Sequence, residues 1–210
     1  MDTDHQSVKR AGSARANYAE QARELLRERL LVAADDLLVD RDWAAITMAD
    51  IAGGAGVSRQ TLYNEFGSRQ EFAQAYVLRE ADRFIAILER AIADHADDRE
   101  AALEAALGGV LHEAVENPLV RAIRAEAATG GLLTLVTTRG TPVVSSATER
   151  LTAFFVTSWP ELPEERARIA ADCAARLAIS HILLPAGSPD DTAASIASML
   201  ATYLQEQHDP

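Results

Sequence analysis

The sequence has few of the features that mark secreted, membrane-spanning or disulfide-stabilised proteins. Cys173 is the only cysteine, so no disulfide can form within the chain, which fits a reducing cytosol. No run approaches the roughly 18 apolar residues that a membrane-spanning helix needs. Residues 1–21 lack the apolar centre of a signal peptide. We therefore expect a cytoplasmic protein with no membrane partner.

Signatures of catalysis and of metal binding are also missing. The 5 histidines form no His-x-x-x-His or Glu-x-x-His pair. There is no Gly-x-Ser-x-Gly turn, and the glycines of residues 53–56 do not belong to a phosphate-binding loop, because no strand precedes them and no Gly-Lys-Ser/Thr follows. Cys173 lies in an apolar helical stripe, which favours a core position over a nucleophile. The sequence thus predicts no catalytic residues, no metal site and no cofactor, and a small helical enzyme is the least favoured interpretation.

Strand signals are scarce, and alanine, leucine, glutamate and arginine dominate, so we expect an all-α fold. The expected helices cover residues 19–39, 68–94, 99–116, 118–128, 142–158, 163–184 and 190–205, and residues 132–138 form a short apolar piece between two of them. Residues 1–18 are polar and basic and predict a flexible arm, either a solvated tail or an arm that contacts phosphates or the minor groove of DNA. The predicted division is this arm, a small three-helix domain over 19–67 and a larger helical domain over 68–207.

The most informative segment is residues 47–69, TMADIAGGAGVSRQTLYNEFGSR, which predicts two short helices joined by a glycine turn. Thr47 is suited to cap the first helix, with Asp50 three residues later as a short form of the capping box. Gly56 stands where a chain that leaves a helix often needs a positive φ. Ser58 is suited to cap the second helix. This arrangement is typical of a helix-turn-helix.

The second helix of this segment has an inward and an outward face. Leu62 and Phe66 are four residues apart, so they share one side and should pack inward. Four polar side chains share a different face: Arg59, Gln60, Tyr63 and Asn64. Arginine can make a double hydrogen bond to guanine, glutamine and asparagine can do so to adenine, and the methyl group of Thr61 can contact thymine. The face can therefore read DNA, and the alternative is a helical hairpin whose polar face is only solvated.

The run T-x-x-D-I-A-x-x-A-G-V-S-x-x-T-L-Y-x-x-F-x-S-R resembles the signature of the TetR family of bacterial transcriptional regulators. The resemblance implies an N-terminal helix-turn-helix head, joined by a long helix to a larger body that binds a ligand and forms a homodimer. It implies that three residues contact phosphates: Thr47, Tyr63 and Arg69. It implies that five others face bases or backbone in the major groove: Ser58, Arg59, Gln60, Thr61 and Asn64.

Three residues depart from the family pattern. Gln60 stands where the family often has glycine, and it could add a base contact. Arg69 replaces a usual lysine and keeps the charge. Glu65 stands where an aromatic residue or histidine is common, and it would repel phosphate if it pointed at DNA. We therefore assign no DNA contact to Glu65.

The formal net charge of −12 is unevenly divided along the chain. Residues 1–70 hold 9 basic and 11 acidic side chains, whereas residues 71–210 hold 11 basic and 21 acidic ones. Most of the negative charge thus belongs to the part that is expected to stay away from DNA. Non-specific affinity for DNA should be weak and sensitive to salt, so specific contacts must matter more.

The body supplies candidates for a dimer interface and for a ligand pocket. The last two predicted helices carry apolar stripes, which are either ordinary core or, as the resemblance implies, a four-helix dimer interface that would contain Leu177, Leu184, Ile196, Leu200, Tyr203 and Leu204. The candidates for ligand contact are Phe84, Leu88, Leu107, Leu111, His112, Arg121, Phe155 and Trp159. Because polar anchors are few, we expect a lipophilic effector such as a fatty acid, an acyl compound or an alkane.

Together these features predict a ligand-responsive transcriptional regulator. The expected form is a repressor that binds a palindromic DNA operator as a homodimer and is released by a lipophilic small molecule. The opposite sign, in which the ligand promotes DNA binding, stays open. The alternative function is a helical protein–protein adaptor that uses the two-helix unit as a docking module.

Overall fold

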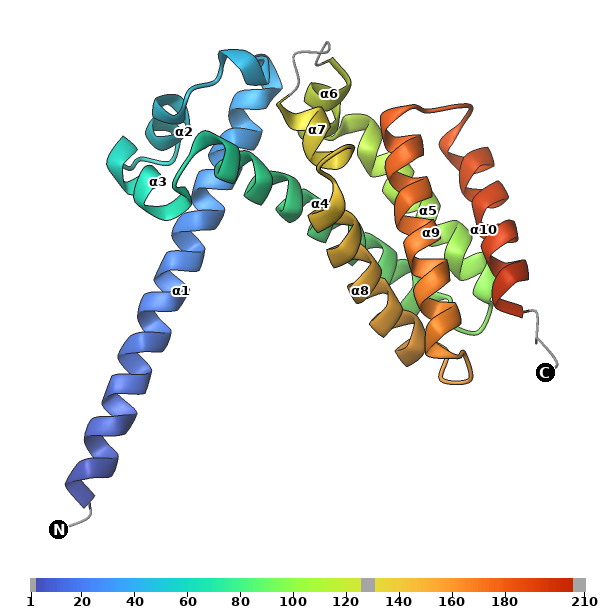
Figure 1. Ribbon diagram of the computed structural model, residues 1–210, viewed down its shortest axis with the longest axis horizontal. Helices are drawn as coiled ribbons and strands as arrows, with labels where there is room; N and C mark the ends of the chain where they lie inside the picture. Colours follow the sequence, from blue (N-terminus) through green and yellow to red (C-terminus); the bar gives the residue numbers. More distant parts are fainter. Residues whose placement is uncertain (1–2, 126–130, 206–210) are drawn as a thin grey trace. The chain divides into compact units, whose positions relative to one another are not determined.

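The computed structural model describes residues 3–125 and 131–205. Within these ranges the regular structure is entirely helical, without strands (Figure 1). The expected all-α fold is therefore confirmed. The chain divides after Arg69 into two compact units. No helix in the described part of the chain combines the length and the apolar character needed to cross a bilayer.

The first unit contains α1 (Thr3–Asp40), η1 (Trp43–Ala45), α2 (Met48–Gly54) and α3 (Arg59–Phe66). The predicted start of the first helix at Ala19 was wrong, because α1 already begins at Thr3 and residues 3–18 are helical. Alanine, arginine and lysine, which occur in residues 3–18, are good helix formers, so a helix can continue through this segment without an apolar stripe. A role of these residues in contacting DNA stays a prediction.

The core of the first unit comes from every one of its helices. Leu30 and Ala34 of α1, Ile46 after η1, Ile51 of α2 and Leu62 of α3 have no exposed surface. Burial of one such large side chain stabilises a fold by about 1.5–3 kcal/mol. These contacts hold α2 and α3 on the C-terminal part of α1, and the polar face of α3 is left outside.

The described residues of the second unit form seven helices, and the first of them, α4, starts at the last residue of the first unit. They are α4 (Arg69–Asp94), α5 (Arg99–Glu116), α6 (Pro118–Ala125), α7 (Leu132–Val136), α8 (Thr141–Ser158), α9 (Glu164–Leu183) and α10 (Pro189–Gln205). The predicted end of α6 at residue 128 lies outside the described residues. Pro118 and Pro189 each open a helix, where proline lacks only an N–H that would have no partner.

The core of the second unit lies between α5, α8, α9 and α10. In Figure 1 α8 runs beside α9, and α5 is packed on α10. Small residues of α9, including Ala167, Ala171 and Ala174, are buried and let the neighbouring helices approach closely. The buried Phe155 and Trp159 stack with ring centroids 5.3 Å apart, and Trp159 Nε1 donates to the carbonyl of Ala96.

Candidate nucleic-acid interface and ligand cavity

The first helix of the two-helix unit begins with a complete capping box. The hydroxyl of Thr47 accepts from the backbone N–H of Asp50, and the Asp50 carboxylate accepts from the Thr47 N–H at 2.8 Å. The Thr47 hydroxyl also donates to this carboxylate at 2.7 Å. These hydrogen bonds from Thr47, followed by one from Arg41, lower the pKa of Asp50 to about 2. The start of α2 is thus fixed by local bonds, as its sequence predicts.

The turn between α2 and α3 depends on glycine and on a second cap. Gly56 has φ +68°, which side-chain-bearing residues rarely adopt. Arg29 of α1 donates to the carbonyl of Ala55 at 2.7 Å and holds this turn. Ser58 accepts from the N–H of Thr61 at 3.0 Å, and its hydroxyl lies 2.8 Å from that of Thr61. The turn and cap that the sequence predicts are therefore present.

The outward face of α3 carries two ordered pairs of polar side chains. Gln60 Nε2 donates to Asn64 Oδ1 at 2.8 Å. The Arg59 guanidinium lies 5.2 Å from the centroid of the Tyr63 ring and donates to its hydroxyl at 3.3 Å. Arg59, Gln60 and Asn64 are exposed, and Tyr63 is half-buried. The structure thus gathers the predicted base-reading residues on one accessible face, while their contact with DNA stays a prediction.

Glu65 lies on a different side of α3 and faces α1. Its carboxylate accepts from Arg23 Nε at 2.8 Å and from Arg27 Nη1 at 2.9 Å. The guanidinium of Arg27 also lies 4.3 Å from the centroid of the Phe66 ring. The departure from the family pattern therefore creates an internal ion pair between helices and does not place a negative charge beside the outward face.

Arg69 is partly committed to the inside of the first unit. Its guanidinium donates to the carbonyls of Ile46 and Trp43 and lies 4.7 Å from the centroid of the Trp43 ring. Burial lowers its pKa from the ordinary value. The sequence predicts a phosphate contact for this arginine, and the structure gives it in addition a role in fixing η1 to the start of α4.

The second unit contains an apolar cavity of about 100 Å³. It lies between α4, α5, α6, α8 and α9, with Val136 of α7 at its wall. Every lining side chain is apolar: Val77, Ala81, Phe84, Ile85, Leu88, Val110, Leu119, Val120, Ile123, Val136, Val143, Ala147, Leu151, Ala175, Ala178, Ile179, Ile182 and Leu183. Such a cavity favours an apolar ligand, because a polar one would lose its hydration without replacement.

Two of the eight predicted ligand contacts, Phe84 and Leu88, line this cavity. The other apolar candidates do not line it, since Leu107, Phe155 and Trp159 are packed in the core and Leu111 borders a separate hollow. The two polar candidates, His112 and Arg121, are exposed and also lie outside the cavity lining. Val77 and Ala81 were missed, although their helical spacing from Phe84 and Leu88 could have revealed them.

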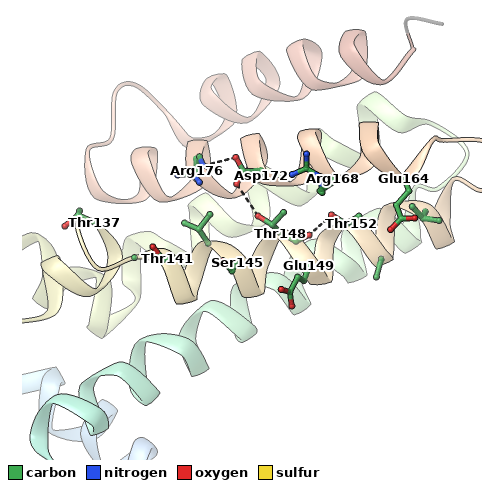
Figure 2. A pocket seen from close by; sticks show the side chains of 14 residues that line it. Thr137, Thr141, Ser145, Thr148, Glu149, Thr152, Glu164, Arg168, Asp172 and Arg176 are labelled. Atoms are coloured by element: carbon green, nitrogen blue, oxygen red, sulfur yellow. Dashed lines mark hydrogen bonds and ion pairs between the residues drawn. The ribbon is translucent and has the colours of Figure 1, made fainter. Parts of the chain in front are cut away.

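A second and larger hollow, of about 730 Å³, lies open along α8 and α9 (Figure 2). Its lining carries both signs of charge, from Glu149, Glu164 and Asp172 and from Arg168 and Arg176. Figure 2 shows Arg176 and Asp172 paired on α9, where Nε donates to the carboxylate at 2.8 Å and lowers the pKa of Asp172. Because this hollow is wide and polar, it is a surface groove rather than a binding site for an apolar molecule.

The six predicted dimer residues differ in how far they are exposed in one subunit. Ile196, Leu200 and Leu204 are buried against the core of their own subunit, where α10 packs on α5. Leu177 and Tyr203 are half-buried against the same core. Leu184 is 77% exposed. Of these residues, only Leu184 offers a largely exposed apolar side chain to a second copy.

Potential metal ligands do not gather in the described part of the chain. No group of three or more histidine, cysteine, aspartate or glutamate side chains is close enough there to hold an ion.

Two family models match the chain. The model for bacterial regulatory proteins of the tetR family matches residues 30–76. The model for the C-terminal domain of the bacterial tetracycline repressor matches residues 98–202. The first match contains the helix-turn-helix, and the second contains most of the cavity-bearing unit.

Similar proteins agree with these matches. The HTH-type transcriptional regulator AlkX of Mycobacterium tuberculosis is 36% identical over 191 residues, which cover 91% of this chain and 90% of that protein. The TetR family repressor AlkX of a Dietzia species, implicated in biodegradation of n-alkanes, has a crystal structure with a TM-score of 0.77 and 40% identity, over 85% of this chain and 95% of that one. Thermus thermophilus FadR in complex with lauroyl-CoA has a TM-score of 0.56 at 18% identity, over 88% and 97% of the chains, which shows a shared fold alone.

The capped helix-turn-helix, the apolar cavity in a separate helical unit and these similarities lead to one assignment: the chain belongs to the TetR family of ligand-responsive, DNA-binding transcriptional regulators.

Proposed function

We propose that this regulator is a repressor, that it binds a palindromic operator as a homodimer, and that a lipophilic small molecule releases it. The observation that carries the DNA-binding part is the exposed face of α3 with Arg59, Gln60 and Asn64. These side chains match the hydrogen-bonding edges of guanine and adenine in the major groove. Because Gln60 and Asn64 are already paired, they are ordered before DNA arrives, which reduces the entropy lost on binding.

The lipophilic character of the effector is supported by the cavity of the second unit. Its lining contains no polar side chain, so affinity must come from burial of apolar surface, at about 25 cal/mol per Å². The AlkX repressor of Dietzia, a relative implicated in biodegradation of n-alkanes, points to the same class of compound. We therefore propose an aliphatic hydrocarbon or an acyl compound as the effector.

The size of the cavity suggests how ligand binding reaches the DNA-binding unit. About 100 Å³ is less than the roughly 300–1,000 Å³ of typical ligand pockets, so an aliphatic chain must widen it. One wall is α4, through Val77, Ala81, Phe84 and Leu88, and α4 begins at Arg69, which is bonded inside the first unit. A ligand that widens the cavity therefore moves α4, and this movement favours a different arrangement of the DNA-binding heads. The ligand thereby lowers the population of the DNA-binding form.

We propose that the homodimer forms through the groove along α8 and α9. A two-fold interface brings the same surface together from both copies, so it must be self-complementary. The groove carries both acidic and basic side chains, as Glu149, Arg168 and Arg176 illustrate (Figure 2). Leu184, which follows α9, adds an exposed apolar side chain. This proposal moves the interface from the predicted α9–α10 stripes to α8 and α9, because the predicted stripe of α10 packs on α5.

Selection of bound sequences from random DNA tests the DNA-binding part of the proposal. We expect an enriched palindrome whose half-sites lie about one helical turn, roughly 34–36 Å, apart. Sedimentation of the free protein should show a dimer at micromolar concentration. A selection without enrichment, or enrichment of a single half-site by a monomer, would contradict the proposed repressor.

A protein–protein adaptor remains the alternative function, supported only by the acidic second unit. Replacement of Arg59 and Gln60 by alanine distinguishes the two functions, since both side chains are exposed and their loss should leave the fold intact. A repressor then loses its operator, whereas an adaptor keeps its partner.

A further inference from the structure

One side chain of α4, Gln74, has a buried donor without an acceptor among the described residues. The Nε2 atom of Gln74 is buried and has no hydrogen-bond partner among the described residues, although the residue as a whole is partly exposed. An unsatisfied buried polar group costs about 1–3 kcal/mol, and native structures contain few of them. A bound molecule that supplies an acceptor to this amide would remove the cost.

Helical spacing places Gln74 on the cavity face of α4. Val77, Ala81, Phe84 and Leu88 line the cavity at intervals of four, three and four residues. Gln74 precedes Val77 by three residues, which continues the same face one turn toward the start of the helix, about 4.5 Å along its axis. The wall that α4 contributes is thus apolar over three turns and ends at a carboxamide.

We propose that Gln74 binds the polar head of the effector, and that the effector is an aliphatic chain with a hydrogen-bond acceptor at one end rather than a bare hydrocarbon. This inference rests on the proposed lipophilic effector. The chain lies in the apolar cavity, and the Gln74 N–H donates to a hydroxyl or carboxyl oxygen at its end. The bond satisfies the amide only when ligand is bound, so it adds affinity as well as orientation.

A cation lies one further turn along the same face. The carboxamide of Gln70, in the orientation that satisfies both of its groups, accepts from the guanidinium of Arg139. Arg139 follows α7, whose Val136 lines the cavity. A carboxylate head would therefore find a positive charge near Gln74, whereas an alcohol would use Gln74 alone. Both heads share an acceptor oxygen, and only the carboxylate head would depend on the charge of Arg139.

The test compares three ligands of equal chain length, octane, 1-octanol and octanoate, on the full-length protein. Binding is measured by calorimetry, and operator release by fluorescence anisotropy. We expect 1-octanol or octanoate to bind more tightly than octane, and Gln74→Leu to weaken the preferred ligand by about 3- to 30-fold without weakening octane. The matched control is Gln205→Leu, at an exposed position of α10, which should change nothing.

Each outcome decides between the proposals. If octanoate is preferred and Arg139→Gln weakens it alone, the head is a carboxylate; if 1-octanol is preferred and Arg139→Gln has no effect, the head is neutral. Equal binding of octane and both polar ligands, or an unchanged preference in Gln74→Leu, overturns the role of Gln74 while the lipophilic effector stands. If none of the three binds, the lipophilic effector itself is wrong, and the role of Gln74 is overturned with it.

Discussion

Replacement of Asn117 by alanine should remove two hydrogen bonds from the junction of α5 and α6. Asn117 Nδ2 donates to the carboxylate of Glu80 at 2.7 Å, and its Oδ1 accepts from the N–H of Val120 at 3.1 Å, in the first turn of α6. Glu80 is only 3% exposed, and it also accepts from Arg79 and Arg83. These bonds fasten the middle of α4 to the next helices of the second unit.

The expected cost follows from the two bonds. Loss of a helix cap destabilises by about 1 kcal/mol, and loss of a hydrogen bond to a charged group by about 1.5–3 kcal/mol. Because Glu80 keeps its two arginine partners, its charge stays compensated, and the larger penalty of an isolated buried ion does not apply. We therefore expect Asn117→Ala to lower the free energy of unfolding by about 2.5–4 kcal/mol.

Urea unfolding followed by circular dichroism measures this change, with Asp98→Ala as the matched control. The exposed Asp98 caps α5 by accepting from the N–H of Ala101 at 3.1 Å, and its carboxylate makes no bond to a buried charged group in the described bonds. The control should cost about 1 kcal/mol. If Asn117→Ala is no more destabilising than Asp98→Ala, the bond between Asn117 and Glu80 contributes nothing, and the reasoning about this buried carboxylate is refuted.

Three further predictions concern the head and the cavity. Gln60→Ala should weaken binding to the selected operator by about 1–3 kcal/mol in anisotropy titrations, with an unchanged melting temperature, and a loss of stability instead would indicate a structural role. The pKa of Asp50 is about 2 instead of the ordinary 3.8, so the stability that the ionised Asp50 contributes should be complete above about pH 4 and lost as the pH falls through 2. Thr47→Val should raise the pKa of Asp50 in an NMR titration, because it removes a hydrogen bond to the carboxylate. An unchanged pKa would contradict the role of Thr47. Ala178→Leu should fill the cavity at a cost of about 1–3 kcal/mol, keep operator binding and abolish thermal stabilisation by octanol, whereas a retained ligand response would place the ligand elsewhere.

The head was predictable because its structure depends on neighbours in sequence. The Thr47 cap, the positive φ of Gly56 and the Ser58 cap all involve residues within three or four positions, so their side-chain types suffice to predict them. The direction of Glu65 was not predictable in the same way. Its carboxylate meets Arg23 and Arg27, about 40 residues earlier, and only the packing of α3 on α1 determines that contact.

The body was less predictable because an apolar stripe does not reveal its partner. The stripe of α10 with Ile196 and Leu200 is equally suited to a second copy or to another helix of the same chain, and the structure places it against α5. The same uncertainty applies to the ligand candidates. Leu107 and Phe155 fill the core whereas Ala81 borders the cavity, and both positions are apolar, so the sequence pattern does not separate core from cavity lining.

Ligand and operator should oppose each other through the second unit, and one titration measures this directly. Labelled operator is titrated with the protein in the absence and in the presence of saturating octanol or octanoate, and the dissociation constant is read from anisotropy. We expect the ligand to weaken operator binding by about 5- to 150-fold, and operator to weaken ligand binding by the same factor. Operator affinity that is unchanged or increased by a ligand that calorimetry shows to be bound would contradict the proposed repressor mechanism.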